Sequence, residues 1–562
     1  MHERGGGPSV LAFGAVLMSA ACASLPGPDL LLVGGPVWTG VPGAPAARGI
    51  AVRGNSIMAV GTEEEIRALA GRGTRVIELG GRMVTPGFID THTHFIEGGF
   101  SLAAVDLRAA ATPAEFTRRL GEFAAALPPG RWILGGYWDH HRWGGTLPEH
   151  AWIDSAAAEN PVWVWRHDGH MALANSLAMR IAGVDEETRA PAGGEMVRDA
   201  SGMPTGIFKD GAMSLVSAHI PAPSEEEQDE ALRAAMGHAA GRGVTGVHDM
   251  GTWADLATYR RARERGELTL RVYAFVPLAS WRRLAAEVAE RGGTGDEWLR
   301  FGGVKGFVDG SLGSATAAFE EPYADEPDNL GLLVTPLDSL RSRIGAADSA
   351  GLHLAVHAIG DRANRLLLDA YEELHREGSP RDRRWRVEHA QHLRSGDIAR
   401  FRRLGVIPSM QPYHAIDDGR WAEQKVGPER AATTYAFRSL LDAEATLTFG
   451  SDWTVAPLDP LLGLYAASTR RTLDGAHPAG WVPEQRISVE EALRAYTRSA
   501  AYAGFADRYT GTLEVGKRAD IAVLSADLLA IPPDRIKAVR VDLTMVDGRI
   551  VFERRPPQGP RS

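Results

Sequence analysis

Residues 87–94 read Gly87-Phe88-Ile89-Asp90-Thr91-His92-Thr93-His94, an apolar run that ends in His-x-His. Side chains two positions apart in a strand point to the same side, so His92 and His94 can bind one ion together. Imidazole nitrogens are ligands that suit Zn2+. Two surface histidines on a strand would give the same pattern, but the preceding Pro86-Gly87 turn and the strand end favour a metal site.

Four more polar residues stand at the ends of predicted strands further along the chain. Lys305 closes FGGVKGF, His357 closes LHLAVHAIG, His389 closes WRVEHAQ and Asp452 closes LTFGSDW. The successive steps are 52, 32 and 63 residues. A strand–helix unit takes roughly 30 residues or more, so the last two steps fit one unit and two units. With His92 on strand 1, the four residues fall on strands 4, 5, 6 and 8.

The central region, residues 86–504, alternates apolar strands with amphipathic helices, as in GLHLAVHAIG followed by DRANRLLLDAYEELHREG. This alternation predicts an α/β fold with a parallel sheet, and a (β/α)8 TIM barrel is its closed form. Catalytic groups on several strand ends then meet at one face of the barrel. The 211 residues from His94 to Lys305 are too many for three units. We therefore expect an insertion after strand 1, at about residues 100–240.

The two ends of the chain share a different pattern. Residues 28–85 and 505–553 contain short alternating strands broken by glycine, and Asp547-Gly548 is a typical hairpin turn. We expect both ends to form one small composite β-sandwich domain. The length of 562 residues leaves room for it, because a lone barrel takes roughly 250.

Composition narrows the classes of partner. The net charge is −10 and no long basic patch stands out, which argues against nucleic acid. A small-molecule substrate is expected instead, and a homo-oligomer stays open. The only cysteine is Cys22, so the chain forms no internal disulfide and the central region offers no thiolate ligand.

Residues 1–27 are predicted to be an export signal. The apolar run VLAFGAVLMSAA, residues 10–21, is too short to span a bilayer but fits a signal core. Cleavage after residue 23 would release a soluble protein into a bacterial periplasm. Cleavage before Cys22 would leave a membrane-anchored lipoprotein, since Ser19-Ala20-Ala21-Cys22 is similar to a lipobox except at Ser19. The third interpretation of this segment is a cytosolic protein whose apolar N-terminus is frayed.

The ordered set of His-x-His, Lys, His, His and Asp resembles the amidohydrolase superfamily. The surrounding sequence resembles the amidohydrolase-3 or YtcJ-like family, which includes N-substituted formamide deformylases. The matching stretches span about residues 28–553 and include GFIDTHTH, RHDGHMALANSLAM, KGFVDGSLGSATAAFEEPY, HAIGD, VEHAQ, PSMQPYHA, GSDW and GTLEVGKRADIAVLS. Several long motifs in one order make this resemblance specific.

The resemblance implies a metal centre. His92 and His94 would bind one ion together with Asp452, and His357 and His389 would bind a second. Lys305 would be carbamylated and bridge them, because a free ammonium cannot bind a cation; the structural alternative is a lysine paired with Asp309. Zn2+ is expected, and one versus two ions stays open.

The resemblance also implies hydrolysis of an amide C–N bond, of the N-formyl or N-acyl amine type. The metal would activate water and polarise the carbonyl, and Asp452 would be the catalytic acid–base. We expect six substrate-binding residues: His170, Asn175, Asp309, Ser311, Gln411 and His414. His392 is expected not to bind metal, and His248 is a candidate lining residue. A hydrolase of cyclic amides, lactones or esters and a non-catalytic metal- or ligand-binding envelope protein stay open as alternatives.

Overall fold

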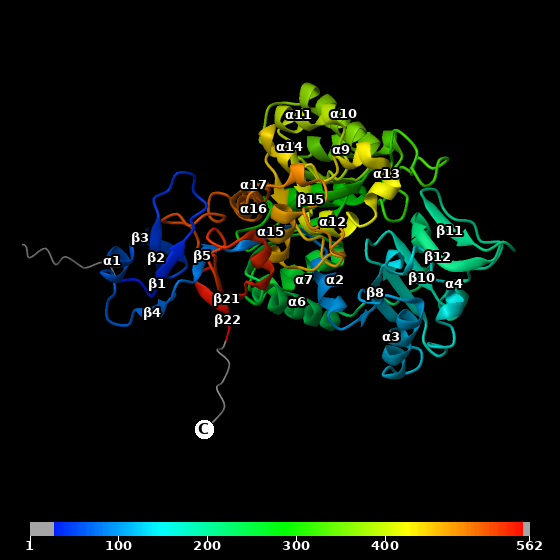
Figure 1. Ribbon diagram of the computed structural model, residues 1–562, viewed down its shortest axis with the longest axis horizontal. Coiled ribbons are helices and arrows are strands. Elements are labelled where there is room, and N and C mark those ends of the chain that lie inside the picture. The colour runs from blue at the N-terminus through cyan, green and yellow to red at the C-terminus, as the bar shows by residue number, and fades with distance from the viewer. Residues whose placement is uncertain (1–26, 555–562) are drawn as a thin grey trace, which may run out of the picture.

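The computed structural model describes residues 27–554. It has three parts: a sheet formed by both chain ends, a central barrel, and an inserted sheet on the other side of the barrel (Figure 1). The predicted signal segment and its Cys22 lie outside the described residues, apart from residue 27. Within residues 27–554, no helix is both long and apolar enough to cross a membrane.

Eight parallel strands form the barrel, in chain order around it. They are β6 (Phe88–Thr93), β13 (Val244–Met250), β14 (Arg271–Pro277), β15 (Leu299–Phe307), β16 (His353–Ala358), β17 (Arg386–His389), β18 (Ile407–Met410) and β19 (Thr448–Phe449). The barrel closes just beyond β19. There the Asp452 N–H donates to the His92 carbonyl at 2.7 Å, and the His94 N–H donates to the Trp453 carbonyl at 2.6 Å. The predicted TIM barrel is confirmed.

Helices surround the barrel strands. They are α6 (Glu225–Ala240), α7 (Trp253–Glu264), α8 (Trp281–Glu290), α9 (Leu337–Ser349), α10 (Asp361–Glu377), α11 (Ser395–Leu404), α14 (Phe437–Asp442) and α16 (Val489–Tyr496). Local sequence fixes several starts, because α6, α7 and α16 each begin with a capping box. Further helices occupy the loops: α2 (Phe95–Ser101), α12 (Pro412–Asp418), α13 (Ala422–Ala431), α15 (Pro460–Thr469) and α17 (Arg498–Ala503).

The two ends of the chain form one eight-stranded mixed sheet in the order β22-β21-β20-β5-β1-β2-β3, with β4 also on β1. Its elements are β1 (Leu30–Val37), β2 (Ala47–Arg53), β3 (Ser56–Gly61), α1 (Glu63–Arg67), β4 (Arg75–Glu78), β5 (Met83–Pro86), β20 (Ile521–Leu524), β21 (Val541–Val546) and β22 (Arg549–Glu553). β1 pairs with β4 along its first half and with β5 at Val37. Both ends of the chain thus share one β structure, since β5 pairs with β20; where a β-sandwich was predicted, the strands are connected as a single mixed sheet.

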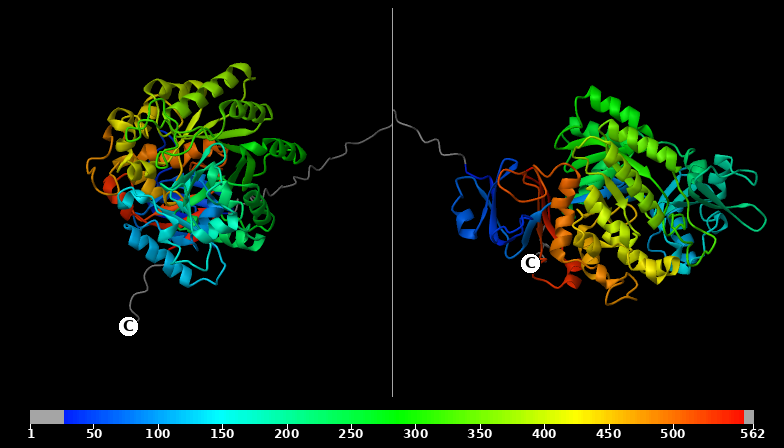
Figure 2. Two further views of the ribbon diagram at one scale, coloured as in Figure 1. Left: turned by 90° about the vertical axis from the view of Figure 1, so that its right-hand side faces the viewer. Right: turned by 90° about the horizontal axis from the view of Figure 1, so that it is seen from above.

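The insertion follows β6 and forms its own six-stranded sheet, in the order β11-β12-β10-β9-β8-β7. Its elements are β7 (Val105–Asp106), α3 (Pro113–Ala125), β8 (Ile133–Trp138), β9 (Val162–Arg166), β10 (Met171–Ala174), α4 (Ser176–Ala182), β11 (Gly194–Arg198), β12 (Pro204–Asp210) and α5 (Ser214–Ser217). Trp138 and Trp163 are fully buried in it, so these tryptophans serve packing. The insertion and the terminal sheet lie at opposite ends of the molecule (Figure 2).

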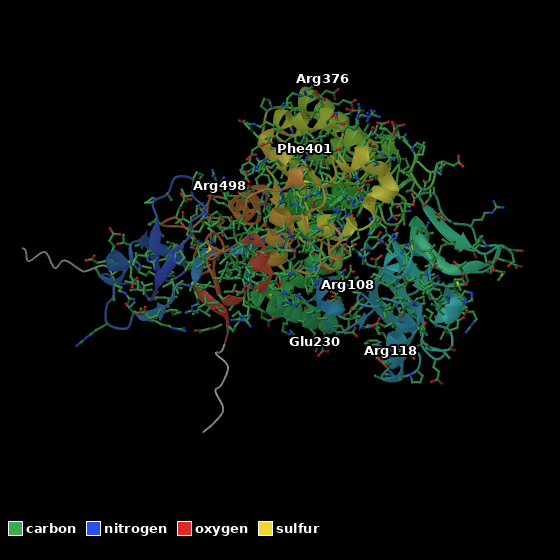
Figure 3. All side chains as sticks on the ribbon, in the orientation of Figure 1. Arg108, Arg118, Glu230, Arg376, Phe401 and Arg498 are labelled. Carbon is green, nitrogen blue, oxygen red and sulfur yellow. The ribbon has the colours of Figure 1, made fainter. Side chains whose placement is uncertain are left out.

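Arg108 joins the insertion to the barrel mouth. Figure 3 labels it at the boundary between the two parts. Its guanidinium donates to the Val455 carbonyl at 2.5 Å and to the Thr454 carbonyl. These carbonyls lie two and three residues after Asp452 in the chain, so the insertion is attached beside the predicted metal site.

Candidate metal centre

The structure brings the six predicted metal-binding side chains together at the C-terminal end of the barrel. His92 lies on the first barrel strand and His94 just after it. Lys305, His357 and His389 lie on the fourth, fifth and sixth strands, and Asp452 lies three residues beyond the eighth. All but His94 are buried.

Asp452 lies at the centre of this group. Its Oδ1 is 3.5 Å from Nε2 of His92 and 3.4 Å from Nε2 of His94, and its Oδ2 is 3.9 Å from Nδ1 of His389. Ligand atoms of His92, His389 and Asp452 all lie within 4.8 Å of one another. Asp452 Oδ1 is buried without a hydrogen-bond partner. A buried, unpartnered carboxylate oxygen facing imidazole nitrogens fits a divalent cation.

The Asp452 carboxylate is held in its ionised form. Burial alone would raise its pKa, but the imidazoles of His92, His94 and His389 lower the pKa well below its usual value. Asp452 can therefore act as a ligand or a base at neutral pH.

Lys305 and His357 complete the group. Lys305 Nζ lies 3.1 Å from His92 Nε2, and the ring of His357 is 4.5 Å from the ring of His389. Burial lowers the pKa of Lys305 to about 8, although Glu388 and Asp452 act to raise it. A substantial fraction of Lys305 is thus the neutral amine near that pH.

Two side chains behind the predicted ligands orient the imidazoles. Nδ1 of His92 lies 2.5 Å from an oxygen of Glu388, and Nδ1 of His389 lies 2.8 Å from Oε1 of Gln411. A neutral imidazole that donates from Nδ1 keeps Nε2 free as an acceptor. Both rings therefore keep Nε2 free as an acceptor, and that of His92 lies 3.5 Å from Asp452 Oδ1.

Sequence reasoning missed Glu388. It is buried, and Arg386 donates to its two oxygens at 2.7 and 2.9 Å. Burial would raise the pKa of Glu388, but Arg386 and His92 lower it well below its usual value. The available signal was the pair of opposite charges two positions apart in the short strand RVEH, which places both on one face of a buried strand.

Three of the six predicted substrate residues line a cavity of about 50 Å³ beside Asp452: His170, Ser311 and His414. Nδ1 of His170 lies 2.6 Å from Asp210. Burial would lower the pKa of His170, but Asp210 raises it to about 9. His414 Nε2 is buried without a hydrogen-bond partner. The cavity therefore combines a protonated imidazole with the metal-binding group.

The other three predicted substrate residues bind the protein itself. Asn175 caps α4 inside the insertion, where its side-chain oxygen accepts from the Ala178 N–H at 2.9 Å. The Asp309 carboxylate accepts three backbone N–H groups, at 2.8 to 3.0 Å, and so fixes the loops that follow β15 and β16. It does not pair with Lys305, which contacts His92. Gln411 orients His389, as described above.

Two further histidines lie away from the centre. His392 faces Thr434, with Nδ1 2.8 Å from its hydroxyl, and contributes no ligand atom to the group. His248 was a candidate lining residue of the site. Instead it faces the barrel interior, where its Nδ1 accepts from Arg386 at 2.8 Å.

A second group of ligand-type side chains, Asp139, His140 and His141, lies in the insertion. Its carboxylate is already paired with two guanidinium groups, from Arg166 at 3.4 Å and Arg420 at 3.0 Å. These fixed positive charges oppose the binding of a cation there. Among the described residues, the group around Asp452 is the better metal site.

Comparison with known proteins shows the family to which the chain belongs. A family model described as the amidohydrolase family matches residues 75–552. The chain belongs to this family. It is 42% identical over 511 residues to Protein LONG AFTER FAR-RED 3 of Arabidopsis thaliana, covering 89% of this chain and 87% of that protein. It is 30% identical to the putative amidohydrolase YtcJ of Bacillus subtilis, covering 93% and 99%.

Two further matches bear on chemistry. N-substituted formamide deformylase of Arthrobacter pascens is 29% identical, with 94% of this chain and 98% of that protein covered. A crystal structure of an uncharacterized metal-dependent hydrolase from Pyrococcus horikoshii matches with a TM-score of 0.73 and 28% identity, covering 90% and 99%. The resemblance inferred from the sequence motifs is confirmed, and the chain is a hydrolase of the metal-dependent amidohydrolase type.

Proposed function

We propose that this hydrolase cleaves the C–N bond of an N-formyl or N-acyl amine with one or two bound Zn2+ ions. The observation that carries the proposal is the buried carboxylate of Asp452, with its unpartnered Oδ1 facing the imidazoles of His92 and His94. The full-length similarity to an N-substituted formamide deformylase supports the choice of bond.

Asp452 and His170 have different roles in the proposed hydrolysis. A bound Zn2+ supplies a Lewis acid that polarises the carbonyl and lowers the pKa of water towards 7. Asp452 takes a proton from the attacking water and delivers it to the leaving nitrogen. As water adds to the carbonyl carbon and the C–N bond breaks, the protonated His170 donates to the oxygen that gains charge. The products are a carboxylic acid and an amine, which exchange a proton to give a carboxylate and an ammonium ion.

We also propose that Lys305 is carbamylated. Only a neutral amine attacks CO2, and burial brings the pKa of Lys305 down to about 8, which makes that form accessible. The reaction forms an N–C bond, releases one proton and turns the amine into an anionic ligand. Mass spectrometry of the intact protein, in bicarbonate and after acid treatment, is expected to show a loss of about 44 Da on acidification.

The test is substitution of Asp452. Asp452→Asn keeps the shape but removes the base, so kcat/KM on a formamide should fall by at least about 1000-fold, while the protein still binds metal. Asp442→Asn on the exposed end of α14 is the matched control and should keep its activity within twofold. Substantial residual activity in Asp452→Asn would contradict the assigned role. The proposal that the enzyme cleaves an N-formyl or N-acyl amine would be refuted by one result. This is wild-type protein that binds metal but cleaves only lactones, esters or cyclic amides, or cleaves nothing.

We further propose that the protein is exported, on the evidence of residues 10–22 alone. Cell fractionation tests this, and Cys22→Ser separates the two routes. Loss of membrane association in Cys22→Ser would favour a lipid anchor, and unchanged periplasmic protein would favour soluble export.

A further inference from the structure

A second and much larger cavity adjoins the metal centre. The cavity beside Asp452 holds about 50 Å³, and the outer one holds about 800 Å³. Gly313 and Trp421 line both, so the two cavities meet at these residues. The outer cavity is walled by the insertion on one side and by loops of the barrel mouth on the other.

The inner cavity limits what can react there. A single water needs roughly 10–15 Å³ in such a cavity, so about 50 Å³ has room for only a few heavy atoms. The amide group and the attacking water fill this space. The outer cavity, which shares Trp421 and Gly313 with the inner one, has room for the rest of a larger substrate.

Trp421, at the junction between the cavities, is buried and packed against the insertion. Trp421 is 6% exposed, and its ring stacks on His141 at 4.6 Å with an interplanar angle of 10°. Its indole N–H has no hydrogen-bond partner in the protein. At Gly313, the other shared residue, an added Cβ would lie 2.3 Å from the buried Arg166 guanidinium, so a larger side chain would displace Arg166.

The wall of the outer cavity is polar, and three of its four lysine and arginine residues, Lys209, Arg420 and Lys425, are already in ion pairs. Lys425 pairs with Asp325 at 2.7 Å and with Glu326 at 3.2 Å. Arg420 pairs with Asp139 and with Asp417. A hydrocarbon placed against these groups would strip water from them without replacing its hydrogen bonds. A charged ligand would compete with existing ion pairs.

We propose that the substrate is a small-acyl amide of a large, uncharged amine rich in hydroxyl or carbonyl groups, with the amine portion in the outer cavity. This inference rests on the proposed function and specifies its substrate class. It predicts that selectivity depends on the amine and on side chains distant from Asp452.

The test compares three formamides on metal-loaded protein: N-formylglucosamine, N-cyclohexylformamide and N-methylformamide. The first two share a six-membered ring and differ in hydroxyl groups. We expect kcat/KM to be at least tenfold higher for N-formylglucosamine than for either of the others. Equal or higher values for N-cyclohexylformamide would overturn the proposed substrate class.

Two variants test whether the amine portion of the substrate binds in the outer cavity. Gln424 lines the outer cavity and is exposed, and Glu423 is its exposed neighbour outside the cavity wall. Gln424→Trp should lower the ratio of kcat/KM for N-formylglucosamine to that for N-methylformamide at least tenfold, mainly through KM. Glu423→Trp should leave that ratio unchanged. Equal ratios in both variants would place the amine elsewhere.

Binding is measured separately by calorimetry, with N-formylglucosamine and metal-loaded Asp452→Asn protein. Binding that Gln424→Trp weakens at least tenfold supports the inference even if turnover is slow. An absence of binding overturns the inference. Metal-loaded wild-type protein that binds N-formylglucosamine but hydrolyses no amide overturns the proposed function instead.

Discussion

His92 has a carboxylate behind it at hydrogen-bond distance. Glu388 faces its Nδ1 at 2.5 Å and is held in turn by Arg386, whereas His389 faces the neutral amide of Gln411. An anion behind an imidazole fixes the tautomer and raises the basicity of the other nitrogen. His92 should therefore be the strongest imidazole ligand of the centre.

Glu388→Gln tests this at the residue scale. Loss of the anion should weaken Zn2+ affinity about 10- to 100-fold, measured by competition with a chelator. Glu377→Gln, at the exposed end of α10, is the control. Thermal melting of the metal-free proteins separates this effect from misfolding. A folded Glu388→Gln protein with wild-type affinity would contradict the role of Glu388.

The sequence predicted that the six metal-binding candidates lie close together, because each stands at or near the end of a predicted strand. Metal-binding candidates stand at strand ends, and strand ends meet in a barrel. The sequence did not predict the hydrogen bonds that Asn175, Asp309 and Gln411 form with the protein, because the partner of an amide or carboxylate depends on groups brought near by folding. Glu388 escaped notice for the same reason, since its partner His92 is 296 residues away.

At the scale of elements, the barrel and the terminal sheet could be predicted because both rest on periodic patterns. β6, β15, β16 and β17 each end at or near a polar residue that the sequence marks. β19 has only two residues, so its strand pattern is weak, and the GSDW motif identified its end instead. The six-stranded sheet of the insertion was not predicted, because its short strands carry no repeated spacing.

A prediction about the attachment of the insertion to the barrel concerns Arg108. It is the side chain that joins the insertion to the carbonyls of Thr454 and Val455, beside Asp452. Hydrogen bonds from a charged donor contribute about 1.5–3 kcal/mol each. Arg108→Ala should therefore make the insertion more than tenfold faster to digest by protease.

Arg118→Ala is the matched control for Arg108→Ala. Arg118 also lies in the insertion, on α3, but forms only an exposed ion pair with Glu122. Such pairs contribute little, so its digestion rate should stay within twofold of wild type. Equal rates in the two variants would show that Arg108 does not hold the insertion in place.

At the scale of the whole molecule, many histidines are buried in neutral form. Burial lowers the pKa of His353 to about 3, with Arg386 acting in the same direction. The unfolded chain, with a histidine pKa near 6.5, binds more protons between pH 3 and 6.5. His353 therefore contributes stability that is full above pH 6.5 and is lost as the pH falls.

The expected effect can be measured by urea unfolding at pH 7 and pH 5. His353 alone should lower the free energy of unfolding by about 2 kcal/mol at the lower pH. His353→Gln should reduce the pH dependence by that amount, and the exposed His375→Gln should not. An unchanged pH dependence in His353→Gln would show that His353 does not titrate in this way.

We propose that one divalent ion or two bind where Asp452 meets the strand-end imidazoles. The most direct measurement is an anomalous difference map from crystals of the Zn2+-loaded protein. Zn2+ bound at this site should give a peak about 2.0–2.2 Å from His92 Nε2 and from an Asp452 oxygen. A peak only at Asp139, His140 and His141, or no peak at the barrel mouth, would contradict it.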